Sequence, residues 1–230
     1  MTLTKEKELT KQEQYEIFEN YRRDWSCFIE EQLELELWSF MRAIIDSVQK
    51  NQRTSVRACH GSSKTITAAA LAVTFLNLYE DSIVITTAPG ERQVKDLLWK
   101  EIRNFYRKFG GDRLVGKCQE LNVKVSEEKG AESYMIGFTT THAPKAEGYH
   151  AANILWIIDE AKGVYPWIYD SMEGSMTGGF SRVLEISTTD GADQQCPFRQ
   201  HHTAKRSKWK CLSLSAFDSP FLNPKDYQKI

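Results

Sequence analysis

The chain has 230 residues, of which 41% are hydrophobic and 27% are charged, an ordinary composition for one large globular domain with or without a small appendage. Its formal net charge of −1 at pH 7 excludes a uniformly basic surface, so any contact with nucleic acid must come from a local patch. Five scattered cysteines without a C-x-x-C pair argue against a disulfide scaffold and a zinc site. The N-terminal stretch is too polar for a signal peptide and no long apolar run exists, so we expect a soluble intracellular protein with no membrane partner.

The first 50 residues are predicted to be helical. Thr10 and Glu13 have the spacing of a capping box, in which each side chain binds the backbone N–H of the other residue. In "LWSFMRAIIDSVQKN" (residues 37–51), apolar side chains recur every three or four residues, which is typical of a helix with one buried face. We expect residues 1–35 to form a helical appendage and residues 36–217 to form the main domain.

After residue 50, short apolar runs alternate with helical patterns. The predicted strands are residues 55–59, 82–89, 122–126, 133–141, 153–161, 181–189 and 208–216. The predicted helices are residues 64–80, 91–109 and 164–176, together with one that begins at Cys196-Pro197. Because strands that are apolar on both faces must be covered on both sides, the pattern predicts an α/β fold with a mostly parallel sheet flanked by helices. Residues 122–126 and 133–141 are predicted to be a hairpin or an excursion from this sheet, and residues 218–230 an exit linker.

The stretch "RACHGSSKT" (residues 57–65) lies between a predicted strand and a predicted helix, where a phosphate-binding loop is found. Lys64 and Thr65 occupy the required positions of G-x-x-x-x-G-K-[ST], but Ala58 and Ser63 replace the two glycines. A residue with a Cβ enters left-handed backbone less readily than glycine, so Ser63 has a conformational cost there. The alternative interpretation is a Ser/Gly loop that only caps the helix.

The stretch "NILWIIDEA" (residues 153–161) has the form of a Walker B strand that ends in Asp159 and Glu160. An Asp at the end of a buried parallel strand can hold Mg²⁺ beside Thr65, and the next carboxylate can polarise the attacking water. Any strand can end in acidic residues, but two motifs in the right order on the right elements favour a site for ATP and Mg²⁺. One strand later, the hydroxyl cluster Ser187, Thr188 and Thr189 is either a sensor of the γ-phosphate or a polar strand end.

Together these residues resemble the ATPase domain of large terminase subunits, the DNA-packaging motors of tailed bacteriophages. The resemblance covers about residues 35–220 and includes "RACHGSSKT", "TTAPGERQVKDLLWKEI", "EGYHAANILWIIDEAKGV" and "SLSAFDSPFLNP". It implies a P-loop ATPase of the additional-strand, conserved-glutamate (RecA-like) type. Such an enzyme uses ATP and Mg²⁺ to translocate double-stranded DNA into a procapsid.

The resemblance also implies a role for each residue that matches a family motif. Lys64 would contact the β- and γ-phosphates, Thr65 and Asp159 would hold Mg²⁺, and Glu160 would activate water. Ser187, Thr188 and Thr189 would couple hydrolysis to motion. The loop residues that would bind the nucleotide are Cys59, His60, Gly61, Ser62, Ser63, Lys64 and Thr65.

The chain departs from the family pattern in its recognition of the base and of the phosphates. Met41, followed by Arg42, stands where the family often has a glutamine that binds adenine, and a thioether cannot make an amide's paired hydrogen bonds. Trp38 or Arg42 is then a candidate to stack on the base, as an alternative to an ordinary core or surface role. At the family's loop arginine position the chain has His60, which either donates to a phosphate or caps the loop. Arg57, three residues earlier, is a candidate for the missing catalytic cation.

The resemblance implies double-stranded DNA, the viral portal protein and the small terminase subunit as partners. It further implies a ring of copies of this chain when assembled, in the cytoplasm of the infected host cell, whereas we expect the isolated chain to be mostly monomeric. The family's nuclease domain has no room within the 230 residues.

Two alternative functions stay open at this point. One is a helicase-like or remodelling DNA translocase on the same fold, although only one ATPase core is found and such helicases carry two. The other is a nucleotide-binding assembly module that does not hydrolyse ATP, which the missing glycines and Met41 favour.

The densest basic stretch, "HHTAKRSKWK" (residues 201–210), is either a contact for DNA phosphates or a solvated helix end. Its adjacent histidines, His201 and His202, do not predict a metal site, because consecutive residues of a helix point in different directions.

Overall fold

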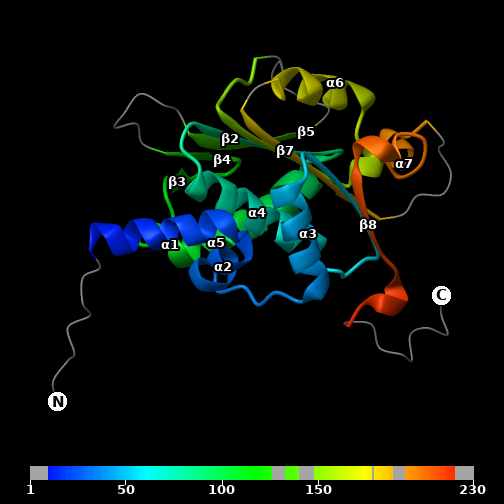
Figure 1. Cartoon of the computed structure of the whole chain (residues 1–230). Helices are drawn as coiled ribbons and strands as arrows, with labels where there is room; N and C mark the ends of the chain where they lie inside the picture. The colour runs from blue at the N-terminus through cyan, green and yellow to red at the C-terminus, as the bar shows by residue number, and fades with distance from the viewer. Residues whose placement is uncertain (1–9, 126–132, 140–147, 178, 189–194, 221–230) are drawn as a thin grey trace.

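The computed structural model describes residues 10–125, 133–139, 148–177, 179–188 and 195–220. One eight-stranded sheet forms the centre, with a thick layer of helices on one face and a thinner helical layer on the other (Figure 1). This arrangement confirms the predicted α/β fold. Within the described ranges, no helix combines the length and the apolar character needed to cross a lipid bilayer.

The helices follow the sequence pattern closely. They are α1 (Lys11–Arg23), α2 (Trp25–Gln32), α3 (Ser39–Lys50), α4 (Lys64–Leu78), α5 (Trp99–Phe109), α6 (Pro166–Ser175) and α7 (Pro197–His202). A π-helical segment, Gln93–Leu98, leads into α5 inside the stretch predicted as one regular helix. Short 3₁₀ turns cover Ala161–Gly163, Arg206–Lys208 and Ala216–Asp218. The predicted capping box of α1 is confirmed, because Glu13 N–H donates to Thr10 Oγ1 at 3.2 Å and Thr10 N–H donates to Glu13 Oε2 at 2.7 Å.

The strands form a sheet in the order β3-β4-β5-β2-β6-β7-β1-β8. Their bounds are β1 (Arg53–Ala58), β2 (Ser82–Ala88), β3 (Lys117–Cys118), β4 (Asn122–Lys124), β5 (Tyr134–Thr139), β6 (Asn153–Asp159), β7 (Phe180–Ser187) and β8 (Lys210–Leu214). Pairing is parallel from β5 to β8, while β4 pairs antiparallel with both β3 and β5. The predicted mostly parallel sheet and the predicted hairpin are therefore both confirmed.

The strand order has one consequence for function. After β1 the chain crosses over β7 and β6 to reach β2, so that β7 lies next to β1 and β6 lies next to β7 in the finished sheet. Because these strands are parallel, their carboxyl ends meet at one edge, which is where open α/β sheets bind ligands. The loop after β1 and the residues after β6 and β7 are thereby brought together.

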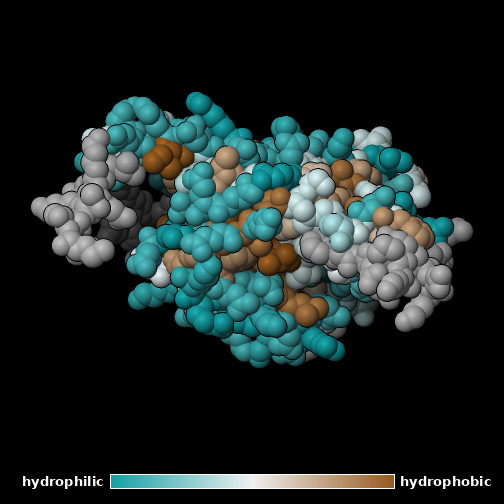
Figure 2. All heavy atoms as spheres, turned by 90° about the horizontal axis from the view of Figure 1, so that it is seen from below, coloured by the Kyte–Doolittle hydropathy of each residue, from teal (hydrophilic) through white to brown (hydrophobic). Residues whose placement is uncertain are grey.

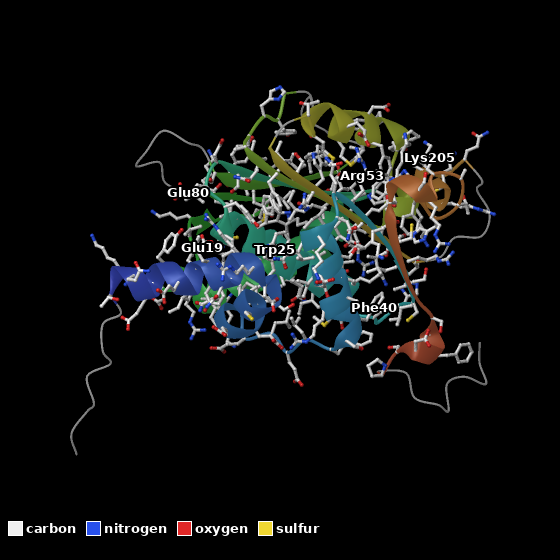
Figure 3. The ribbon with its side chains drawn as sticks, viewed as in Figure 1. Glu19, Trp25, Phe40, Arg53, Glu80 and Lys205 are labelled. Atoms are coloured by element: carbon white, nitrogen blue, oxygen red, sulfur yellow. The ribbon has the colours of Figure 1, made fainter. Side chains whose placement is uncertain are left out.

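The thick helical layer is built around α4. Nearly every side chain of α4 is buried, from Thr67 to Leu78, as expected for a helix that is apolar all round. The apolar face predicted for α3 packs into the same core. So does α2, whose Trp25 meets Phe75 of α4 edge to face at 6.0 Å between ring centroids (Figure 3). Tyr21 of α1 and Trp25 of α2 thus share one hydrophobic core with α3 and α4.

The opposite face of the sheet is covered by α6 and α7 over a second apolar cluster that contains Trp156, Met172 and Phe198. Arg53 of β1 reaches this layer and binds Glu173 of α6 through two hydrogen bonds, at 3.2 Å and 2.7 Å (Figure 3). The surface seen from below, on the side of α1 and α2, is mostly hydrophilic, with hydrophobic residues in separate small patches (Figure 2). All five cysteines are free thiols, as the sequence predicts.

Gly137 of β5 gives a test of the packing beneath α5. A Cβ at this position would lie 2.1 Å from Trp99 Nε1, and the fully buried Trp99 is held by a 2.8 Å hydrogen bond from Nε1 to Thr86 Oγ1. Because the indole cannot move away without breaking that bond, we expect Gly137→Ala to lower the free energy of unfolding by about 1–3 kcal/mol, measured by urea denaturation.

Gly174→Ala is the matched control, because a Cβ there would contact nothing within 4 Å. In helix α6 this change should leave stability unchanged or raise it by about 0.5–1 kcal/mol. A Gly137→Ala variant as stable as the control would contradict the packing of Trp99 against β5.

Candidate active site

The loop between β1 and α4 turns sharply through left-handed backbone. Gly61 has φ 69° and Ser63 has φ 61° with ψ 17°, and α4 begins at the next residue. Ser63 therefore adopts the conformation that the motif's glycine provides, and accepts the steric cost of its Cβ. His60 and Gly61 are exposed at the tip of the loop, and Cys59 is half-buried. The positive end of the α4 dipole faces this turn, as a phosphate site requires.

Lys64 is buried in the loop that it follows, with only 8% of its surface exposed. Its Nζ donates to Ala58 O at 3.1 Å, to Cys59 O at 2.6 Å and to Ser62 Oγ at 3.1 Å. Burial lowers the pKa of the ammonium, whereas the nearby charges of Glu160 and Asp159 oppose that shift. The loop thus holds its one buried cation opposite two carboxylates.

Asp159, the last residue of β6, is 2% exposed. Burial raises the pKa of its carboxyl to about 7, although hydrogen bonds from the Glu160 N–H and the Thr65 hydroxyl favour the charged form. The sheet therefore brings Thr65 and Asp159 into direct contact, as predicted from motifs far apart in the sequence. A hydroxyl and a carboxylate are hard oxygen donors, and Mg²⁺ is typically held by one or two carboxylates together with substrate phosphates. These two residues fit that ion.

Glu160 is the second strained residue of the site, with φ 48°. Four non-glycine residues of the described chain have positive φ, and two of them, Ser63 and Glu160, belong to this site. Such strain persists where the surrounding structure fixes the conformation, commonly at functional positions. Glu160 Oε2 accepts a hydrogen bond from Ser187 Oγ at 3.3 Å, which links the carboxylate to the end of β7.

Lys162 is a site residue that the sequence analysis missed. Its Nζ donates to Thr188 Oγ1 at 2.8 Å, and its backbone N–H points to Ser187 Oγ at 3.4 Å. Two of the three residues predicted to sense the γ-phosphate are thus tied to the segment after β6, and Thr189 lies outside the described residues. The only signal for Lys162 in the sequence is its place two residues after Glu160, and most lysines in such turns are simply solvated.

The residues at the positions predicted for base recognition, on or beside α3, already contact other parts of the protein. Met41 is 2% exposed and packs in the core with the rest of the α3 apolar face, and its role in binding a base stays a prediction. Arg42 forms an ion pair with Glu30 of α2. Trp38 is half-buried at the start of α3 and packs against Phe40, with ring centroids 5.7 Å apart.

Arg57 lies on the strand that leads into the loop, with its side chain exposed. Its Nη2 donates to Ser213 Oγ of β8 at 3.3 Å. Strand alternation places Arg57 on the sheet face opposite Ala58, whose side chain is in the core beneath α4. The structure therefore directs Arg57 towards β8.

A buried polar cluster under α7 was also missed. Glu185 of β7 is fully buried and accepts hydrogen bonds from Tyr169 OH at 2.8 Å, from His201 Nδ1 at 2.9 Å and from Ser55 Oγ. His201 also stacks on Trp209, with ring centroids 4.1 Å apart. In the described part of the chain no group of three or more His, Cys, Asp or Glu side chains is arranged to hold a metal.

The basic stretch 201–210 is therefore partly structural. His201 and Trp209 are buried, whereas Arg206 and Lys205 (labelled in Figure 3), which follow α7, are exposed. Both interpretations of the exposed cations stay open.

No protein-family model matches the chain. A curated "Probable terminase, large subunit" of Enterobacteria phage P7 is 27% identical over 173 residues, which are 73% of this chain and 35% of that protein. A mutant ATPase domain of the Thermus phage P74-26 large terminase superposes with a TM-score of 0.64 at 16% identity, covering 87% of this chain and 88% of that one. This chain has the fold of a large-terminase ATPase domain.

A second solved structure extends the likeness. The large terminase of the thermophilic bacteriophage D6E in complex with ADP has a TM-score of 0.60 at 9% identity, covering 79% of this chain and 45% of that one. These comparisons confirm the predicted resemblance to large terminase subunits and the predicted fold of their ATPase domain. The chain spans about a third of the length of the curated phage P7 relative.

Ser63 gives a test of the strain in the loop. Because its backbone is left-handed, Ser63→Gly should raise the free energy of unfolding by about 1 kcal/mol, measured by urea denaturation. Ser63→Ala keeps the Cβ and removes the hydroxyl, so this control should show no gain. A Gly variant no more stable than wild type would contradict the strain. Loss of ATP binding in both variants would show that the hydroxyl is itself a phosphate ligand.

Proposed function

We propose that this chain is a Mg²⁺-dependent ATPase and the motor domain of a viral DNA-packaging machine. The contact between Thr65 and Asp159, beside the buried Lys64, is the observation that carries the proposal. The proposal is supported by the closeness of these three residues at one edge of a sheet whose fold is that of terminase ATPase domains.

Binding of ATP would begin at the loop. The α4 N-terminus and the loop N–H groups attract phosphate oxygens, and Lys64 supplies a point charge to the β- and γ-phosphates. Its ammonium now binds two backbone carbonyls and Ser62, so phosphates would replace these acceptors as it engages the ligand. Thr65 and Asp159 would hold Mg²⁺. When bound, the ion neutralises phosphate charge and orients the terminal group for displacement.

Glu160 would accept the proton of the attacking water. Glu160 directly follows β6, at the same edge of the sheet, and the hydrogen bond from Ser187 restricts the orientation of its carboxylate. The strained backbone at Glu160 fixes its direction relative to Asp159, whose Oδ1 accepts the Glu160 N–H at 2.8 Å. A general base positioned in this way typically contributes about 10²–10⁴-fold to a rate.

The partners of the motor follow from the relatives. The phage P7 protein is named as a large terminase subunit, and the D6E enzyme was solved with ADP. By that likeness this chain would act on double-stranded DNA with a portal protein and a small terminase subunit, as a ring of copies, in the cytoplasm of the infected cell. Residues 36–217 would be the motor, residues 1–35 its helical appendage and residues 218–230 a linker to a further domain.

The second candidate is an assembly module that binds nucleotide without hydrolysing it. The strain at Ser63 favours it, because a less permissive loop is expected to bind phosphates less readily than a glycine loop. The hydrogen-bonded Glu160 opposes it, since a module without turnover has no need of a positioned base.

Glu160→Gln distinguishes the two candidates. An amide of the same shape cannot accept a proton, so kcat for ATP should fall by about 10²–10⁴-fold while the Kd for ATP changes little. Phosphate release and equilibrium binding are the measurements. Glu36→Gln, at an exposed residue between α2 and α3, is the matched control and should behave as wild type. Turnover within a few-fold of wild type in Glu160→Gln would exclude Glu160 as the base.

Lys64→Ala tests the loop itself. Removing a charge-assisted contact should weaken binding of ATP by about tenfold to a hundredfold, as measured by titration with a fluorescent ATP analogue. Lys100→Ala, at an exposed residue of α5, controls for the loss of one positive charge. Unchanged affinity in Lys64→Ala would remove the assignment of residues 58–65 as a phosphate-binding loop.

A further inference from the structure

Lys162 lies in the 3₁₀ turn Ala161–Gly163, which directly follows Glu160. The turn is fixed at three points. The Lys162 ammonium donates to Thr188 Oγ1 at 2.8 Å, its backbone N–H points to Ser187 Oγ at 3.4 Å, and its carbonyl accepts from Cys196 Sγ at 3.4 Å. A half-buried lysine held in this way has lost much of the freedom that makes an ordinary turn lysine a solvated side chain.

The charge of Lys162 lies near the charge of the loop lysine, Lys64. The ammonium groups of Lys162 and Lys64 are close enough to interact electrostatically, and Lys64 interacts in turn with Asp159 and Glu160. Two cations and two carboxylates therefore share the edge of the sheet formed by β1, β6 and β7. Arg57, the cation suggested by the sequence, is instead hydrogen-bonded to Ser213 on β8.

We infer that Lys162 is a catalytic cation that this chain supplies in cis to the γ-phosphate of ATP, with Thr188 as the residue that positions it. The inference rests on the proposed ATPase function. An ammonium has three N–H donors, and Thr188 takes one of them in the described contacts, which leaves donors for phosphate oxygens. Lysine is a compact point charge, suited to a phosphate group.

Lys162 would assist the hydrolysis of the terminal phosphate of ATP. Water forms a bond to the γ-phosphorus, the bond from that phosphorus to the β,γ-bridging oxygen breaks, and ADP and phosphate are released. Glu160 takes the proton of the water. Lys162 stabilises negative charge on the transferred group, and it contacts only the third phosphate, so its effect is confined to ATP and the transition state.

The hydrogen bond from Lys162 to Thr188 also connects the candidate site with other elements of the domain. Thr188 immediately follows β7, and the Lys162 carbonyl contacts Cys196, the residue that precedes α7. Occupation of Lys162 by a γ-phosphate would compete with its bond to Thr188, and loss of that phosphate would restore the bond. This gives Ser187 and Thr188 a physical means of sensing hydrolysis.

The test compares Lys162→Ala, Lys162→Arg and the exposed-lysine control Lys100→Ala in steady-state hydrolysis and in binding of ATPγS and ADP. For Lys162→Ala we expect kcat to fall by about 10²–10³-fold, as for loss of one preorganised donor. The affinity for ATPγS should fall by about tenfold, while the affinity for ADP stays within about twofold, because ADP lacks the third phosphate. Lys162→Arg should restore part of kcat, and Lys100→Ala should match wild type.

The outcomes separate the inference from the proposed function. If wild type hydrolyses ATP and Lys162→Ala retains both its kcat and its preference for ATPγS over ADP, Lys162 is not the γ-phosphate cation, and the proposed function stands. An equal loss of ATPγS and ADP affinity, with a lowered midpoint of urea unfolding, would show a structural role and also overturn the inference. A wild-type chain that neither binds nor hydrolyses ATP would overturn the proposed function, and the inference with it.

Discussion

The structure depends on one constraint, which is the burial of the Lys64 ammonium beside the Asp159 carboxyl at the common edge of β1, β6 and β7. Buried charges are tolerated only when they are paired and hydrogen-bonded. Lys64 meets that condition with two backbone carbonyls and Ser62, and Asp159 with the Glu160 N–H and the Thr65 hydroxyl. The strand order supplies this arrangement, because it sets β7 beside β1, the strand that leads into the loop, and β6 beside β7.

This arrangement requires left-handed backbone at Ser63, the last residue of the loop before α4, and at Glu160, which carries the second carboxylate. Left-handed backbone costs a non-glycine residue about 1–2 kcal/mol, which a domain of this size can offset elsewhere. The offset comes from the almost fully buried α4, which is packed between the sheet and the other helices of its layer. Packed surroundings on both sides therefore hold Ser63 and Glu160 in an unfavourable backbone conformation, as is common at functional positions.

Local signals in the sequence were enough to predict the element types, the mostly parallel sheet and the contact between Thr65 and Asp159. They could not predict which strands are neighbours, because β1 and β7 are far apart in the chain and pair only through the finished sheet. Met41 is buried because it lies on the apolar face of α3, which the sequence predicted. Lys162 and Glu185 were missed because their roles come from tertiary partners, which no local pattern encodes.

The central claim is that the loop around Lys64 is a phosphate site completed by Thr65 and Asp159. A crystal structure of the Glu160→Gln variant with ATP and Mg²⁺ tests it most directly. The account predicts that the triphosphate lies in the loop, with Lys64 Nζ moved from the carbonyls of Ala58 and Cys59 to the β- and γ-phosphates and the metal beside Thr65 and Asp159. A nucleotide bound elsewhere, with Lys64 still on those two carbonyls, would contradict it.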